Sequence, residues 1–181
     1  HKFIRLPQKI NYHSVLLWSS IVFYIAYFTY YSFEMYNNFF TGRFDLGNMD
    51  QTVWNTLNGR IFQLTDPDGV STVSRFAVHG DIILVLLSPL YLIWSDPRML
   101  LLLQTIVLSL GAVFVYLIAR KVLVDKNLSF AFALSYLLYP AVGYVNLYDF
   151  HAVSLATTFL LAAFYFYLTK NYILVTVFAL L

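Results

Sequence analysis

The sequence predicts an all-α fold, a polytopic bundle of transmembrane helices. Hydrophobic residues make up 60% of the 181 residues and charged residues only 11%, whereas a soluble domain carries about 25% charged residues. The apolar residues also gather in runs close to the length of about 20 residues that a helix needs to cross roughly 30 Å of hydrocarbon. These runs predict membrane helices over residues 15–33, 99–119, 128–147, 152–169 and 173–181.

Both ends of the sequence look like boundaries inside a longer protein. The first residue is His1 rather than Met, and the run 173–181 is too short for one membrane crossing. Residues 1–181 are therefore expected to form one N-terminal fragment of a larger transmembrane domain. The absence of cysteine excludes disulfides and thiolate metal sites. No Lys/Arg cluster is dense enough to predict a nucleic-acid partner.

The threading of the chain depends on residues 82–94, an apolar segment with Pro89 that would form a helix of only about 20 Å. Segments of this length are more often re-entrant or interfacial than spanning. If this one does not span and the N-terminus is cytosolic, seven of the 11 Lys and Arg residues are cytosolic, against four otherwise. The positive-inside rule favours the first arrangement. It makes residues 34–98 an extracytoplasmic loop of a multi-pass cell-membrane protein.

Part of this loop has helical periodicity and predicts an amphipathic helix lying in the membrane plane. Asp45 is a plausible N-cap, and Asn58-Gly59 is expected to end the helix. Beyond it, Asp66-Pro67-Asp68-Gly69 predicts a turn. The apolar positions recur every three or four residues, at Leu46, Met49, Val53, Leu57 and Ile61.

Several polar residues are candidates for chemistry at the outer face. Asp50 falls inside the apolar stripe, where a carboxylate needs a partner or a proton; a structural hydrogen bond to a neighbouring helix end or to an Arg explains it equally well. Asp45 is either a cap or a base. His79 and Asp81 precede the short apolar segment, where Asp81 would serve as a helix cap. The short turn between two spanning helices holds Asp149 and His151, which fit either a polar turn or a cation or phosphate site.

Carboxylates and histidines gathered at one membrane face can support general-base chemistry or hold a divalent metal ion. The spacing of these residues is not specific for a metal, since there is no HExxH motif. No cofactor is therefore predicted from spacing alone.

The run Phe44-Asp45-Leu46-Gly47-Asn48-Met49-Asp50-Gln51-Thr52-Val53-Trp54-Asn55 resembles the signature of an uncharacterised family of prokaryotic predicted membrane proteins, a domain of unknown function. The segments His79-Gly80, Ser95-Asp96-Pro97-Arg98, Leu101–Gln104 and Asp149-Phe150-His151 also match, in the same order. The resemblance covers the chain from about Phe33 onward.

That family in turn resembles the GT-C superfamily of membrane glycosyltransferases, which move a sugar from a lipid-phosphate carrier at the outer membrane face. The resemblance implies a GT-C-like fold and hexosyl transfer, with a lipid-linked sugar donor and membrane lipids as partners. It implies that Asp45, with Asp50 second, is the catalytic base. It also implies that substrate or phosphate is bound by Arg75, His79, Asp149 and His151.

Two other functions remain open on the residues alone. A transporter or channel would carry ionisable residues inside its spanning helices, but the spanning runs hold essentially none, and Gln104 is their main polar residue. A non-catalytic scaffold would leave the acidic residues of the loop apart. An outer-face enzyme requires Asp45 or Asp50 to share a cavity with His79 and with Asp149 or His151. In that case the carboxylate-to-imidazole separations are expected to be about 10 Å or less.

Overall fold

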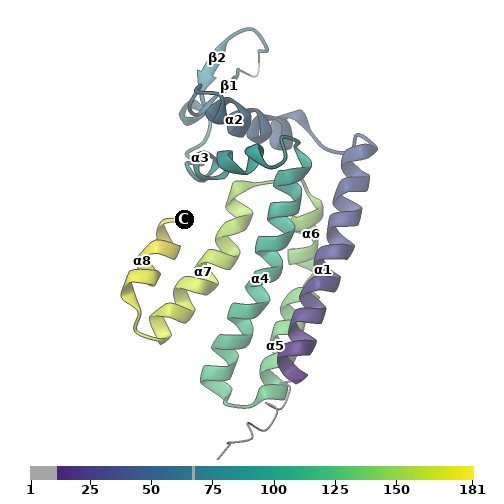
Figure 1. The fold of residues 1–181 in the computed structure, drawn as a ribbon, viewed down its shortest axis with the longest axis vertical. Helices are drawn as coiled ribbons and strands as arrows, with labels where there is room; N and C mark the ends of the chain where they lie inside the picture. Colours follow the sequence, from purple (N-terminus) through teal and green to yellow (C-terminus); the bar gives the residue numbers. More distant parts are fainter. Residues whose placement is uncertain (1–11, 67) are drawn as a thin grey trace, which may run out of the picture.

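The structure, a computed structural model, describes residues 12–66 and 68–181 and is mostly helical. Long helices run side by side, and the loop between the first two long helices covers one end of them (Figure 1). Within these described residues, three helical spans are long and apolar enough to cross a membrane: Tyr12–Asn37, Arg98–Leu123 and Lys126–Leu147. The prediction of a helical membrane protein is confirmed at this level.

The first long helix, α1 (Tyr12–Asn37), packs beside α4 (Arg98–Leu123) and α5 (Lys126–Leu137). Leu17, Ile21 and Tyr24 of α1 lie in the core between these helices. The chain then continues through α6 (Pro140–Leu147), α7 (Ala152–Leu168) and α8 (Tyr172–Leu180). The bundle therefore provides the scaffold on which the loop after α1 rests.

The predicted helix over residues 128–147 is interrupted in the structure. Tyr139 has an extended backbone, with φ −67° and ψ 120°, between the end of α5 and the start of α6. Pro140 explains the break, because its ring disfavours a helical conformation in the preceding residue and it has no N–H to donate. The 17-residue helix α7 is apolar but shorter than the three candidate spans.

The loop after α1 (residues 38–97) lies outside one end of the bundle and covers it (Figure 1), and for that position we call it the outer cap. It begins with a π-helical turn, η1 (Arg43–Gly47), and α2 (Asn48–Leu57). Leu46, Met49 and Val53 are buried, as the periodicity predicts, whereas Ile61 is 67% exposed. Asn58 and Gly59 end α2 as expected, and Gly59 has a left-handed φ of +82°.

A short antiparallel hairpin in the outer cap departs from the predicted all-α class. Strands β1 (Gln63–Thr65) and β2 (Thr72–Ser74) pair with Leu64 opposite Val73. The turn predicted around Asp68 and Gly69 joins them: Asp68 Oδ1 accepts from Val70 N at 2.9 Å, and Gly69 has φ +78°. Sequence periodicity missed the hairpin because each strand has only three residues.

The apolar segment predicted to be re-entrant forms a short helix α3 (Ile83–Leu87) followed by a 3-10 turn, η3 (Ser88–Leu92). Both pack against α2 at the same end of the bundle (Figure 1). Leu84 and Tyr91 are buried there together with Leu100 of α4 and Phe150. The segment therefore does not run the length of the bundle.

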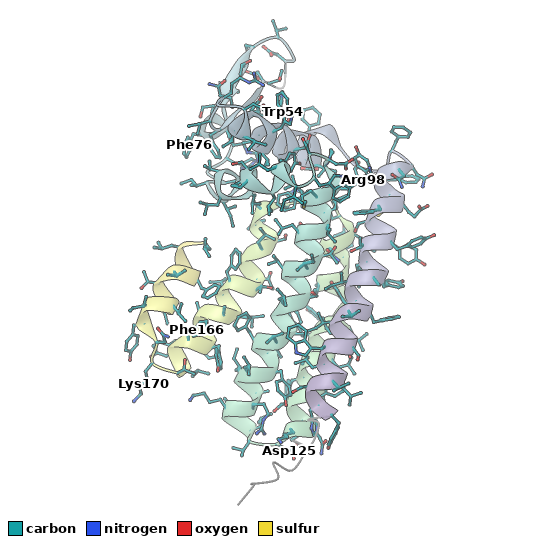
Figure 2. The ribbon with its side chains drawn as sticks, viewed as in Figure 1. Trp54, Phe76, Arg98, Asp125, Phe166 and Lys170 are labelled. Atoms are coloured by element: carbon teal, nitrogen blue, oxygen red, sulfur yellow. The ribbon has the colours of Figure 1, made fainter. Side chains whose placement is uncertain are left out.

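The two ends of the bundle differ in their side chains. Trp54, Phe76 and Arg98 lie at the end that carries the outer cap, and Asp125 and Lys170 lie toward the other end (Figure 2). The last turn of α4 carries Arg120 and Lys121, so the connection from α4 to α5 is basic. The polar groups that could do chemistry are at the capped end.

Candidate functional site

Two segments far apart in the chain meet at the capped end of the bundle. The first is η1 with Gly42 before it, and the second is the linker Tyr148–His151 between α6 and α7. Gly42 N donates to Asp149 Oδ2 at 2.6 Å across 107 residues of sequence. His151 Nε2 lies 3.2 Å from Asp45 Oδ1. We call Asp45, Asp149 and His151 the acidic site.

Asp45 reaches this position because it does not cap α2. The N-cap position of α2 belongs to Gly47, and Asp45 lies inside η1, where Gly47 N donates to Gly42 O at 3.2 Å. The prediction that Asp45 is the N-cap is therefore wrong: the chain already coils before Asn48. The carboxylate is free to turn toward the α6–α7 linker, and its side chain is 36% exposed.

His151 faces an oxygen from each ring nitrogen. Nε2 faces the Asp45 carboxylate, and Nδ1 lies 3.2 Å from the carbonyl oxygen of Asp149. Both neighbours are acceptors, so only a doubly protonated ring can donate to both. The Tyr148 ring lies beside it, with centroids 5.3 Å apart. The side chain of His151 is 29% exposed and remains open to a ligand.

Asp149 is buried, and its surroundings act on its charge in opposite directions. Burial raises the pKa of its carboxyl above the usual value, and the nearby Asp45 carboxylate raises it further. The hydrogen bond from Gly42 N and the charge of His151 lower it. A Cβ on Gly42 would lie 3.3 Å from Asp149 Oδ2 and 3.9 Å from Asp45 Oδ2. Gly42 thus lets both carboxylates approach the same piece of backbone.

The α6–α7 linker is held from below by Gln104, a fully buried residue of α4. Its Nε2 donates to the carbonyls of Val145 and Asp149, and its Oε1 accepts from His151 N and Ser154 Oγ. The sequence marked Gln104 only as the main polar residue of the spanning runs. A polar residue inside a membrane helix usually forms hydrogen bonds with groups of neighbouring helices. This rule was the only signal in the sequence that Gln104 would hold another segment.

Two shallow cavities border the acidic site. One, of about 480 Å³, is lined by Asp45, Asp149 and Gly42 together with residues of α1 and α6. The other, of about 320 Å³, is lined by His151. Tyr144 and Tyr148 line both cavities, and their stacked rings are 6.2 Å apart. A ligand at the tyrosines could therefore reach the carboxylates on one side and the imidazole on the other.

Asp50 lies away from the acidic site, where α2 packs against η3. Its Oδ1 accepts a hydrogen bond of 2.5 Å from the hydroxyl of Tyr91 in η3. Burial raises the pKa of Asp50 above its usual value, the Tyr91 hydrogen bond lowers it, and the nearby Asp96 raises it. Asp50 does not line either cavity of the acidic site. Asp50 is thus hydrogen-bonded, as one alternative predicted, but its partner is a tyrosine hydroxyl rather than a helix end or an Arg.

Arg75 and His79 also lie outside these two cavities. Arg75 is 1% exposed. Its guanidinium pairs with the carboxylate of Asp81, and Arg75 Nη2 lies 2.7 Å from Asp81 Oδ2. The prediction that Asp81 caps the next helix is wrong, because the N-cap of α3 is Ile82 and the Asp81 carboxylate is bound to Arg75. His79 is exposed. Of the residues expected to share one cavity, Asp45 and Asp149 line the larger cavity together, and His79 does not.

Within residues 12–66 and 68–181, no group of three or more His, Asp or Glu side chains is arranged to hold a metal ion. Asp45 and Asp149 offer carboxylates near one point, but the Asp45 carboxylate is paired with His151, and the Gly42 N–H binds Asp149. The described donors therefore do not fit a metal centre.

Residues 35–181 match the model of a protein family described as predicted membrane protein (DUF2079). The match begins near the end of α1 and includes the outer cap, the acidic site and every later helix. No curated protein matches the chain. No solved structure matches it.

Proposed function

We propose that this chain, which belongs to the family of predicted membrane proteins (DUF2079), carries part of a glycosyltransferase site that transfers a sugar from a lipid-phosphate carrier. The carrying observation is the acidic site, where Asp45 and His151 meet across more than 100 residues of sequence. Local structure does not require this meeting, since a turn and a helix end can each be solvated by water. An enzyme does require base and binding groups around one ligand.

Asp45 is the general base of the proposed reaction. Its carboxylate accepts the proton of an acceptor hydroxyl while the hydroxyl oxygen attacks the anomeric carbon of the donor. The bond from that carbon to the phosphate oxygen breaks, and the phosphate leaves with the electron pair. Asp45 suits this role because its side chain is 36% exposed and lines a cavity. The carboxylate of Asp50, in contrast, is hydrogen-bonded to the hydroxyl of Tyr91. A positioned base of this kind contributes about 10²–10⁴-fold to the rate.

His151 and Asp149 complete the proposed site. His151 orients Asp45 through the ion pair, and in its protonated form it offsets negative charge on the leaving phosphate. Asp149 fixes Gly42 and with it the approach of η1 to the linker. Tyr144 and Tyr148 offer exposed ring faces, 71% and 52% exposed, between the two cavities. Arg75 and His79 receive no role in the reaction because neither lines the cavities.

The test of this proposal is the transfer activity of Asp45→Asn. The wild-type protein in membranes should move a hexose from a polyprenyl-phosphate-linked donor, and Asp45→Asn should lower the rate about 100-fold or more. The variant should stay folded, because Asp45 caps no helix. Asp68→Asn is the matched control: it removes an exposed carboxylate of the same cap and keeps the acceptor for Val70 N. Full activity in Asp45→Asn, or no transfer by the wild type from any such donor, would contradict the proposal.

We further place the capped end on the extracytoplasmic side. Arg120, Lys121 and Lys126 surround the α4–α5 connection at the opposite end, and basic connections stay in the cytosol. Leu86, Leu92 and Ile93 are 62%, 76% and 80% exposed, which suits a segment that dips into the membrane boundary. The N-terminus is then cytosolic.

Cysteine labelling tests this side assignment, because the sequence has no cysteine of its own. In intact cells, a membrane-impermeant maleimide should label Cys introduced at Asp66 and Tyr148, both at the capped end. Cys introduced at Lys126 should be labelled only after the membrane is opened. If the Cys residues at positions 66 and 148 are labelled from opposite sides of the membrane, the two segments cannot form one site. If all three positions are labelled from the side opposite to the expected one, the proposed topology is inverted.

A further inference from the structure

An apolar groove lies between α1 and the interrupted helix α5–α6, away from the acidic site. Its volume is about 620 Å³, within the range of about 300–1,000 Å³ of small-molecule pockets. Aliphatic and aromatic side chains make most of its walls, including Leu16, Phe23 and Leu137. Of its two serines, Ser20 donates to the carbonyl of Leu16 in its own helix, so it needs no polar ligand.

The helix break creates this groove. Leu138, Tyr139 and Pro140 all line it, and they form the point where α5 ends and α6 begins. Beyond the break the two helices close again: a Cβ on Gly143 would lie 3.1 Å from Phe28 Cζ. Leu138 and Tyr139 remain 71% and 60% exposed. The groove is thus open along a part of the bundle that the membrane would surround.

The groove and the larger cavity of the acidic site lie on one seam between the same two helices. On α6, Gly143 lines the groove, and Tyr144 and Leu147 line the cavity with Asp45 and Asp149. On α1, Phe28 lines the groove and Met35 lines the cavity; residues seven apart share one face of a helix. From Gly143 to the helix end beside Asp149 the rise is less than about 10 Å.

We infer that this groove holds the hydrocarbon chain of the substrate whose polar head reaches the acidic site. The inference rests on the proposed function for the nature of the head, and it adds that the substrate is an amphiphile bound along the α1–α6 seam. A groove with mostly apolar walls among membrane helices matches the apolar surface of a hydrocarbon chain better than it matches water. Past Gly143, where the two helices close again, the chain lies on the outer side of the Phe28–Gly143 contact and reaches Tyr144, which is 71% exposed and lines the cavity.

The experiment uses the full-length protein in lipid nanodiscs and a polyprenyl phosphate with a diazirine in its hydrocarbon chain. After irradiation, labelled peptides should come from residues 16–28 of α1 and residues 134–143 around the break. An excess of unlabelled polyprenyl phosphate should compete the label away. Ser19→Trp puts a large ring on a residue that lines the groove and should lower this labelling about tenfold. Val22→Trp introduces the same ring on α1 at a position that is 63% exposed and does not line the groove, and it should leave the labelling unchanged.

Several outcomes would overturn the inference. One is label spread evenly over the lipid-facing surfaces of α1, α7 and α8, or label that a competitor does not remove. Another is equal labelling by a diazirine phosphatidylglycerol, which would make the groove an ordinary lipid contact. A third is an unlabelled groove, which would mean that another protein segment covers it. Asp45→Asn should keep the chain labelling. Labelling without any sugar transfer by the wild type would therefore defeat the proposed function and leave the groove inference standing.

Discussion

Asp45 and Asp50 stand five residues apart in one helical segment, yet their surroundings differ in kind. Asp45 is partly exposed, borders a cavity and pairs with His151 from the α6–α7 linker. Asp50 is half-buried and bonded to Tyr91 of η3, inside the outer cap. Five residues turn an ideal helix through roughly 140°, so the two carboxylates face different neighbours. The same chemical group serves an open site in one case and a packed cap in the other.

The difference shows that an acidic residue in an apolar stripe is not by itself a sign of catalysis. Asp50 was the more unusual residue in the sequence, and in the structure its carboxylate accepts a hydrogen bond from the hydroxyl of Tyr91. Asp45 looked like an ordinary cap, and it is the residue that meets a histidine from a distant segment. Two predictions would break or sharpen this contrast, beginning with the larger effect.

The open site should depend on Gln104. Gln104→Met keeps a similar length but leaves the N–H of His151 without its partner, and the carbonyl of Asp149 keeps only its contact with the His151 ring. A buried polar group left unpaired costs about 1–3 kcal/mol, so the free energy of unfolding should fall by about 1–3 kcal/mol. Cysteine-free protein in detergent, unfolded by SDS or heat, gives the measurement.

Ser109→Ala is the matched control for Gln104→Met on the same helix. Ser109 is equally buried, but its hydroxyl donates only to the carbonyl of Ile106 in α4, so its loss should cost less than about 1 kcal/mol. The Asp50–Tyr91 contact should survive in both variants, since it lies in the outer cap. Equal stability of Gln104→Met and Ser109→Ala would mean that the linker does not need Gln104.

The closed site should show a smaller, pH-dependent effect. Because burial raises the pKa of folded Asp50 above 3.8, ionisation costs more in the folded than in the unfolded protein. This contribution to stability is complete below about pH 4 and is lost as pH rises through the folded pKa. Asp50→Asn keeps an acceptor for Tyr91 and removes the ionisation. Near pH 7 it should melt at the same temperature as wild type or a few degrees higher, with no difference below about pH 4.

Asp68→Asn provides the comparison for the pH series, because Asp68 is an exposed residue of the hairpin turn. Its melting curve should follow the wild type at every pH. If Asp50→Asn is clearly less stable than wild type at pH 7, the Asp50 carboxylate is stabilised as an anion. The account of Asp50 as a packed residue would then be wrong.

Some parts of the fold were accessible from the sequence because their causes are local. The left-handed preference of Gly59 ended α2 where predicted, and the Asp68–Gly69 turn formed as expected. Predictions of helix caps failed at Asp45 and Asp81, because a carboxylate that finds an ion-pair partner elsewhere need not cap. The approach of Asp45 to His151 was one of the expected arrangements, whereas the pair between Arg75 and Asp81 was not expected.

The sequence by itself determined that this is a helical membrane protein with six of its nine Asp and Glu residues in the loop after the first long helix. Apolar run length and charge content decide this, since a chain poor in charge cannot cover a water-facing surface. Only the tertiary structure decided which acidic residues meet. That choice depends on the path of the chain through η1, on the break at Pro140 and on the hold of Gln104 on the linker. These are contacts between distant residues, and no local pattern encodes the partner of such a contact.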